Sequence, residues 1–151
     1  NHIYPDYDFS LLRAHHFRKE PSAAAAAEAV DERLRAGVAV ACMTRYTDLI
    51  RIEGLKYHGI YYFVPGMLRH FDTEAVMALA APRPMLFMTG GKDSGSPASG
   101  IARLEPPIRE AYRLYGAESA FESRLYPDLG HVYTPEMWHH TQAWLGRHLG
   151  P

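Results

Sequence analysis

Apolar residues along the chain gather in short unbroken runs, which are separated by longer amphipathic stretches. Two runs lie at residues 37–43 and 85–89, and each contains almost no polar side chain. Runs of this kind are typical of strands that are buried on both faces of a parallel sheet. We therefore predict strands over these two segments, and a third strand over residues 121–126, which follows the next helical stretch.

Helical patterns fill the segments before and between the first two strands. We predict a helix over residues 22–35 with Ser22 as its N-cap, one over 46–53 closed by Gly54, and one over 72–80 with Asp72 as its N-cap. The alanine run at 23–27 favours the first of them, because alanine is the best helix former. Residues 56–70 mix aromatic residues with proline and glycine, which indicates an ordered excursion without a regular element.

Two further helices are predicted in the second half of the chain. Apolar residues recur at helical spacing at Ile101, Leu104, Ile108, Tyr112 and Tyr115. Pro106 and Pro107 fit this helix only if it starts near them. The last helix takes Thr134 as cap and Pro135 as its first residue, and we expect its inner face to carry Trp138, Thr141, Leu145 and Leu149.

This alternation of helices and strands predicts the α/β class, with three α/β/α layers around a small, mostly parallel sheet and right-handed crossovers. We divide the chain into an N-terminal arm, residues 1–22, and a domain over residues 23–151. Three strands leave sheet edges to be covered. We expect the arm, a missing N-terminal portion or a second copy of the chain to cover them, which favours a homodimer.

Composition narrows the class of partner. The formal net charge is −1 over 151 residues, and basic residues are scattered, so neither nucleic acid nor an anionic membrane is an expected partner. There is no apolar run long enough for a membrane span, and the first residues do not form a secretory leader, which favours a cytoplasmic location. The single cysteine, Cys42, excludes an internal disulfide. We find no motif for a cofactor or a metal.

Titratable side chains follow the second and third predicted strands. Asp93 ends Gly90-Gly91-Lys92-Asp93, and His131 follows Gly130. Catalytic groups of open α/β sheets collect beyond the carboxyl ends of the strands. An acid followed 38 residues later by a histidine has the order of the last two members of a Ser…Asp…His triad. Asp93 as a plain turn residue, and His131 as an ordinary surface residue, are the alternatives.

Beyond these two residues, several segments resemble the C-terminal half of α/β-hydrolases of the dienelactone hydrolase and acetyl xylan esterase-like group. The matching segments are 30–36 (VDERLRA), 57–61 (YHGIY), 64–66 (VPG), 80–86 (AAPRPML), 90–93 (GGKD) and 130–137 (GHVYTPEM). The resemblance extends from about residue 28 to residue 149. It implies a partial α/β-hydrolase fold and ester hydrolysis through an acyl-enzyme, with Asp93 as the triad acid and His131 as the general base.

The chain departs from that family at the nucleophile. No Gly-x-Ser-x-Gly pentapeptide is present, and the corresponding residues, 17–22, contain no glycine. Ser22 is better explained as a helix cap, and Cys42 as a small core residue. Three hypotheses stay open: a truncated or rearranged esterase, a catalytically inactive binding or assembly module, and a hydrolase with an unorthodox nucleophile such as Ser10, Ser22 or Cys42. A small-molecule ester is the expected substrate if the chain is active.

Overall fold

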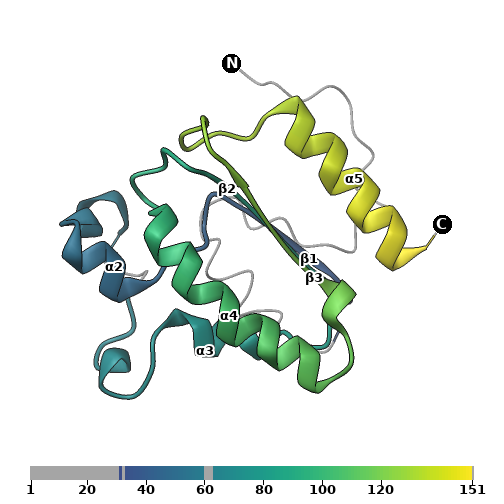
Figure 1. Ribbon diagram of the computed structural model, residues 1–151, viewed down its shortest axis with the longest axis horizontal. Coiled ribbons are helices and arrows are strands. Elements are labelled where there is room, and N and C mark those ends of the chain that lie inside the picture. The colour runs from purple at the N-terminus through teal and green to yellow at the C-terminus, as the bar shows by residue number, and fades with distance from the viewer. Residues whose placement is uncertain (1–30, 32, 60–62, 151) are drawn as a thin grey trace.

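A three-stranded parallel sheet lies at the centre of the computed structural model, which describes residues 31, 33–59 and 63–150 (Figure 1). Its strands are β1 (Gly37–Val40), β2 (Met85–Gly90) and β3 (Phe121–Tyr126), in the order β1-β2-β3. Helices cover both faces, so the predicted α/β/α fold class is confirmed, as are the three predicted strands. The predicted N-terminal arm, residues 1–22, lies outside the described residues.

The central strand β2 shows why an unbroken apolar run in the sequence predicts a strand. Every residue of β2 is buried, and it pairs with β1 through Val38↔Leu86 and with β3 through Leu86↔Glu122. Side chains alternate between the faces of a strand. Met85 and Phe87 therefore pack into one core cluster, whereas Leu86 and Met88 pack into another on the opposite face. A strand buried on both faces is expected to be nearly continuous in apolar residues, and Thr89 near the end of β2 is its one polar side chain.

The helices divide unequally between the two faces of the sheet (Figure 1). The helices α2 (Tyr46–Arg51), α3 (Thr73–Ala78) and α4 (Ala98–Leu114) lie on one side, and α5 (Pro135–Leu149) lies on the other. Short 3-10 turns, Gly54–Tyr57, Met67–Arg69 and Glu118–Ala120, are the other elements of the described residues. The first overlaps the start of segment 56–70, where no regular element was expected, and the second lies within it.

The segment before β1 differs from its prediction. Residues 31 and 33–36 are not helical, so the helix predicted over 22–35 does not extend through its last residues, and residues 22–30 lie outside the described part. Asp31 provides a reason, because its Oδ1 accepts the Arg33 backbone N–H at 3.1 Å. Such side-chain bonds to nearby backbone favour turns over helix. Strand β1 also ends three residues early, since Ala41 turns left-handed with φ 56°.

Helix α4 begins eight residues before the prolines that were expected to start it. Its 17 residues run from Ala98, and Pro106 and Pro107 lie in its interior. Both prolines are exposed, as are Ala102 and Arg103, whose carbonyls lose their helical partners. Water can therefore bind those carbonyls, which reduces the cost of the prolines. Ile101, Leu104, Ile108 and Tyr112 are buried as predicted, whereas Tyr115 follows the last turn and is exposed.

Helix α5 confirms its predicted start and part of its predicted face. The Thr134 hydroxyl accepts the Met137 N–H, and Pro135 is the first residue. The buried residues are Met137, Thr141 and Trp144. Of the expected face, Thr141 is buried and Leu145 packs against the cluster of Leu86 and Met88, whereas Met137 takes the buried position that was expected for Trp138.

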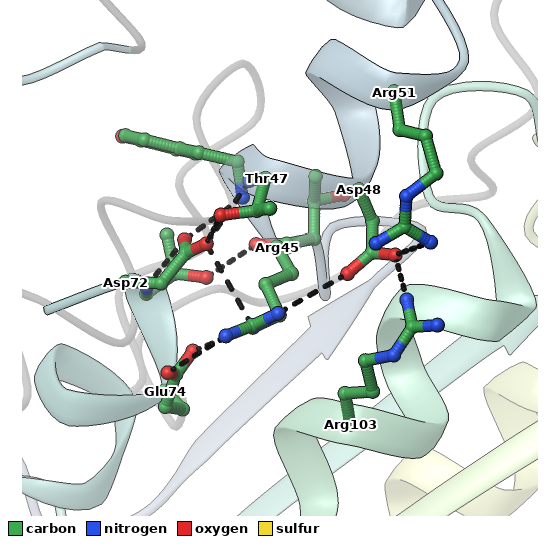
Figure 2. Close-up of polar contacts among 10 residues, drawn as sticks. Arg45, Thr47, Asp48, Arg51, Asp72, Glu74 and Arg103 are labelled. Atoms are coloured by element: carbon green, nitrogen blue, oxygen red, sulfur yellow. Dashed lines mark hydrogen bonds and ion pairs between the residues drawn. The ribbon is translucent and has the colours of Figure 1, made fainter. Parts of the chain in front are cut away.

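Buried carboxylates tie the three helices of the other face together (Figure 2). Asp72, the predicted N-cap of α3, accepts the Thr73 N–H at 2.8 Å and also the N–H groups of Tyr46 and Thr47, at 2.9 and 3.0 Å, in the first turn of α2. Its Oδ2 also accepts the Thr47 hydroxyl at 2.7 Å. One side chain thus caps two helices that are separated by a long excursion.

A second buried carboxylate, Asp48, joins α2 to α4. Asp48 Oδ1 pairs with Arg51 at 3.0 Å and with Arg103 of α4, while Arg45 lies 3.6 Å from its Oδ2 (Figure 2). The helices approach closely here: a Cβ at Gly100 would lie 3.1 Å from the Cβ of Asp48. Glycine at this position of α4 therefore lets the two helices meet.

Removing the shared cap should destabilise the fold in a pH-dependent way. Burial alone would raise the pKa of Asp72, but the hydrogen bonds from Thr47, Thr73 and Tyr46 outweigh burial and lower that pKa. A lowered pKa means that the stabilisation is present above the ordinary value of 3.8 and is lost as the pH falls through the folded-state value. We expect Asp72→Ala to cost about 2 kcal/mol of unfolding free energy at neutral pH, since two caps are lost.

Urea unfolding at pH 7 and at pH 3 measures this effect. The difference between wild type and Asp72→Ala should shrink at the lower pH. Glu110→Ala serves as the control, because Glu110 forms an exposed pair with Arg113 and its removal should leave stability almost unchanged. Equal losses in the two variants would contradict the shared-cap assignment.

We expect the chain to self-associate, because in the part that the structure describes the two outer strands of the sheet have unpaired edges. Neither β1 nor β3 has a second strand partner among the described residues. Unpaired N–H and C=O groups along such edges favour pairing with another strand. We expect sedimentation velocity at micromolar concentration to detect a dimer, and a stable monomer would contradict this prediction.

Candidate active site

The loops that follow β2 and β3 meet in backbone contact at the carboxyl end of the sheet. The Gly91 N–H donates to the Tyr126 carbonyl at 2.7 Å, and the Lys92 N–H donates to the Leu129 carbonyl at 2.8 Å. A Cβ on Gly90 would overlap the carbonyl oxygens of Leu129 and Gly130. The glycine pair therefore permits an approach that no larger residue would allow.

This contact brings the two predicted site residues together. His131 Nδ1 lies 2.9 Å from Asp93 Oδ2. An ionised carboxylate can only accept a hydrogen bond, so Nδ1 carries the proton of this bond, and in the neutral ring the lone pair is on Nε2. The Asp93 side chain is 2% exposed and that of His131 is 72% exposed. The carboxylate is thus fixed inside the protein, while the imidazole reaches outward with a basic nitrogen.

The second carboxylate oxygen is held by the loop that carries it. Asp93 Oδ1 accepts the Gly95 N–H at 2.8 Å, and the Gly95 carbonyl accepts the Thr44 hydroxyl at 2.8 Å. Thr44 Oγ1 is also 2.9 Å from Ser96 Oγ, and both side chains are fully buried. Because the Thr44 proton is used on the Gly95 carbonyl, Ser96 must be the donor of this pair. The sequence analysis did not single out Thr44, Gly95 or Ser96 for this role.

Of the three candidate nucleophiles, Cys42 alone lies in the described part of the chain, and no hydrogen bond joins it to His131 there. Cys42 is buried, and burial together with the negative charge of Asp93 raises the pKa of its thiol. A thiolate, which is the reactive form, is therefore disfavoured at this position. Ser10 and Ser22 lie outside the described part of the chain. Among the described residues, no other side chain forms a hydrogen bond with His131 Nε2.

The described residues include neither a cluster of metal-ligating side chains nor a helix that could span a membrane. Within them, no three histidine, cysteine or acidic side chains come together as metal ligands would. Every helix in these ranges is too short or too polar to serve as a membrane span.

Comparison with known proteins identifies relatives of the hydrolase type. The putative hydrolase YtaP of Bacillus subtilis is 30% identical over 121 residues, which are 80% of this chain and 40% of that protein. The chain therefore spans about two-fifths of the length of this curated relative.

Solved esterases share the fold. A glucuronoyl esterase from Solibacter usitatus superposes with a TM-score of 0.69 at 16% identity, covering 86% of this chain and 40% of that one. An esterase from Pyrococcus furiosus gives 0.61 at 17% identity, covering 86% and 51%. At such identities the likeness concerns the fold alone. The resemblance to α/β-hydrolases of the esterase type is confirmed at this level.

A family model described as the Maf1 regulator matches residues 1–76. From residue 31 onward, the same residues supply β1, α2 and the start of α3 in the sheet-and-helix arrangement shared with the esterases. Asp93 and His131 both lie beyond the matched range, so that match carries no information about the pair.

Adding a methyl group at Gly90 should separate the two loops. The overlap would be with backbone oxygens, which cannot rotate away, so we expect Gly90→Ala to cost about 2 kcal/mol of unfolding free energy. Thermal and urea unfolding measure this loss. Gly146→Ala is the matched control: Gly146 lies in α5 with open space around it, and the change should stabilise by about 0.5 kcal/mol. A stable Gly90→Ala protein would contradict the close approach.

Proposed function

We propose that this chain, which belongs to the Maf1 regulator family through residues 1–76, takes part in carboxylic ester hydrolysis, because its fold is that of the α/β-hydrolases of the esterase type. Asp93 is the acid and His131 the general base of this proposed site. We favour the reaction type of the dienelactone hydrolase and acetyl xylan esterase-like group for this site. The substrate is a small ester.

The distance of 2.9 Å between His131 Nδ1 and Asp93 Oδ2 is the observation that carries this proposal. A buried acid bonded to Nδ1 fixes the tautomer of the ring and stabilises the imidazolium that forms when Nε2 takes a proton. An ordinary turn aspartate would not need a histidine from another strand end, and an ordinary surface histidine would not need a buried carboxylate. The pairing therefore favours a catalytic role over both plain alternatives.

In the proposed reaction, Nε2 removes a proton from the attacking hydroxyl or water as its oxygen bonds to the ester carbonyl carbon. The imidazolium then returns that proton to the departing alkoxide as the carbon–oxygen bond breaks. Asp93 stays ionised throughout and offsets the positive charge on the ring. No described residue bonded to His131 supplies the attacking hydroxyl, so the mechanism names no nucleophilic residue.

A catalytically inactive α/β-hydrolase-like binding or assembly module is the second candidate. Two observations favour it: His131 Nε2 has no hydroxyl or thiol partner among the described residues, and the family model that matches residues 1–76 is that of a regulator. In this case the Asp93–His131 pair would be an inherited structural feature.

Hydrolysis of p-nitrophenyl acetate by the purified chain distinguishes the two candidates. We expect Asp93→Asn and His131→Ala each to lower the rate by about 10²- to 10⁴-fold, because each removes the oriented general base. His139→Ala is the control, since His139 is an exposed residue of α5 and removes one imidazole without touching the pair.

Unchanged rates in both site variants would exclude the Asp93–His131 mechanism. Equal losses in both would support it and leave the nucleophile as the next target. A wild-type rate no higher than that of His131→Ala or of free imidazole would favour the inactive module.

A further inference from the structure

A third polar residue reaches the acid loop from a distant part of the chain. His58 follows the 3-10 turn Gly54–Tyr57, and its Nε2 lies 2.8 Å from the Gly95 carbonyl oxygen. A carbonyl oxygen can only accept, so Nε2 of His58 must carry a proton and donate it. The Gly95 carbonyl, with two lone pairs, is then bonded by both His58 and Thr44.

Gly95 lies between this histidine and the acid. Its N–H donates to Asp93 Oδ1, and its carbonyl accepts from His58. A Cβ at Gly95 would stand 3.3 Å from Asp93 Oδ1 and 3.5 Å from His58 Nε2, so both side chains lie close against this residue. The position of Gly95, and with it the direction of its N–H, is fixed from the carbonyl side.

The His58 ring is itself held in place. It is partly buried, and it meets the Phe63 ring edge-on with centroids 6.4 Å apart at 85°. Residues 55–57, which precede it, are exposed. His58 therefore connects an outer segment of the chain to the innermost carboxylate of the candidate site.

We propose that His58 is a positioning residue for the Asp93–His131 pair. It acts through Gly95, by fixing the N–H that orients the Asp93 carboxylate toward His131 Nδ1. Its effect on catalysis rests on the proposed esterase function, whereas its effect on the Asp93–His131 hydrogen bond does not. The two can therefore be tested separately.

The hydrogen bond is tested by one-dimensional proton NMR of the whole chain. The Nδ1 proton of His131 should give a resonance far downfield of the amides, which is assigned by its loss in Asp93→Asn. His58→Gln places an amide N–H close to the position of Nε2 and should retain this resonance. His58→Asn carries the same amide one methylene short of Gly95, and its resonance should broaden or exchange with water about tenfold faster.

The same pair of variants tests the catalytic consequence. With p-nitrophenyl acetate, we expect His58→Asn to lower kcat by about 10- to 100-fold with little change in KM, because a misplaced base slows proton transfer rather than binding. His58→Gln should recover most of the rate. His139→Gln, on the outer face of α5, should match wild type in both measurements.

The outcomes separate the two claims. A chain without hydrolytic activity would refute the proposed function, yet the resonance would still decide the role of His58. A resonance that is unchanged in His58→Asn, lost equally in His58→Asn and His58→Gln, or absent from the wild type would overturn the positioning role. Its loss in His58→Asn and retention in His58→Gln, with matching circular dichroism spectra, would establish it.

Discussion

The contact between the backbone loops at the carboxyl ends of β2 and β3 is the constraint on which the candidate site depends. Gly90 lies where any Cβ would overlap the carbonyl oxygens of Leu129 and Gly130, and Gly91 lies where a Cβ would be 2.8 Å from the Pro127 carbonyl oxygen. Because backbone hydrogen bonds join these two loops, from the Gly91 and Lys92 N–H groups to the Tyr126 and Leu129 carbonyls, Asp93 and His131 start from fixed positions. Parallel register places both strand ends at the same edge of the sheet, and the glycines remove the remaining distance.

The layer formed by α2, α3 and α4 contains short helices that need stabilisation from outside themselves. Helices α2 and α3 have six residues each, too few to be stable alone. Buried carboxylates supply what the helices lack, since Asp72 binds N–H groups of both and Asp48 pairs with arginines from α2 and α4 (Figure 2). A buried charge is costly unless it is paired and hydrogen-bonded. These pairs therefore act mainly by fixing where the helices stand, and that layer in turn carries Thr44 and the loop before α4.

The sequence predicted the sheet well because burial on both faces leaves little freedom: β2 is apolar except for Thr89 near its end. Caps were predicted equally well at Asp72 and Thr134, since a cap is a local interaction between neighbours. Predictions failed where tertiary packing decides. The apolar face of α4 was predicted, but the pattern did not show that the helix continues before Pro106 and Pro107, because this depends on whether the carbonyls that lose their partners reach water. On α5, Thr141 and Leu145 were placed correctly, but Trp138 was expected where its neighbour Met137 is buried, because only the packing against Leu86 and Met88 selects between these adjacent residues.

The residues of the candidate site also differ in whether local sequence or tertiary contacts determine them. Asp93 and His131 could be found from the sequence because strand ends, a glycine pair and their order mark them without any knowledge of distant contacts. His58, Thr44 and Gly95 could not, since their bonds join residues 37 and 51 positions apart and run through a backbone carbonyl, which every residue has. A side chain that recognises main chain leaves no complementary residue in the sequence. The residues that hold a catalytic acid in place are therefore harder to predict than the acid itself, although the direction of the carboxylate depends on both.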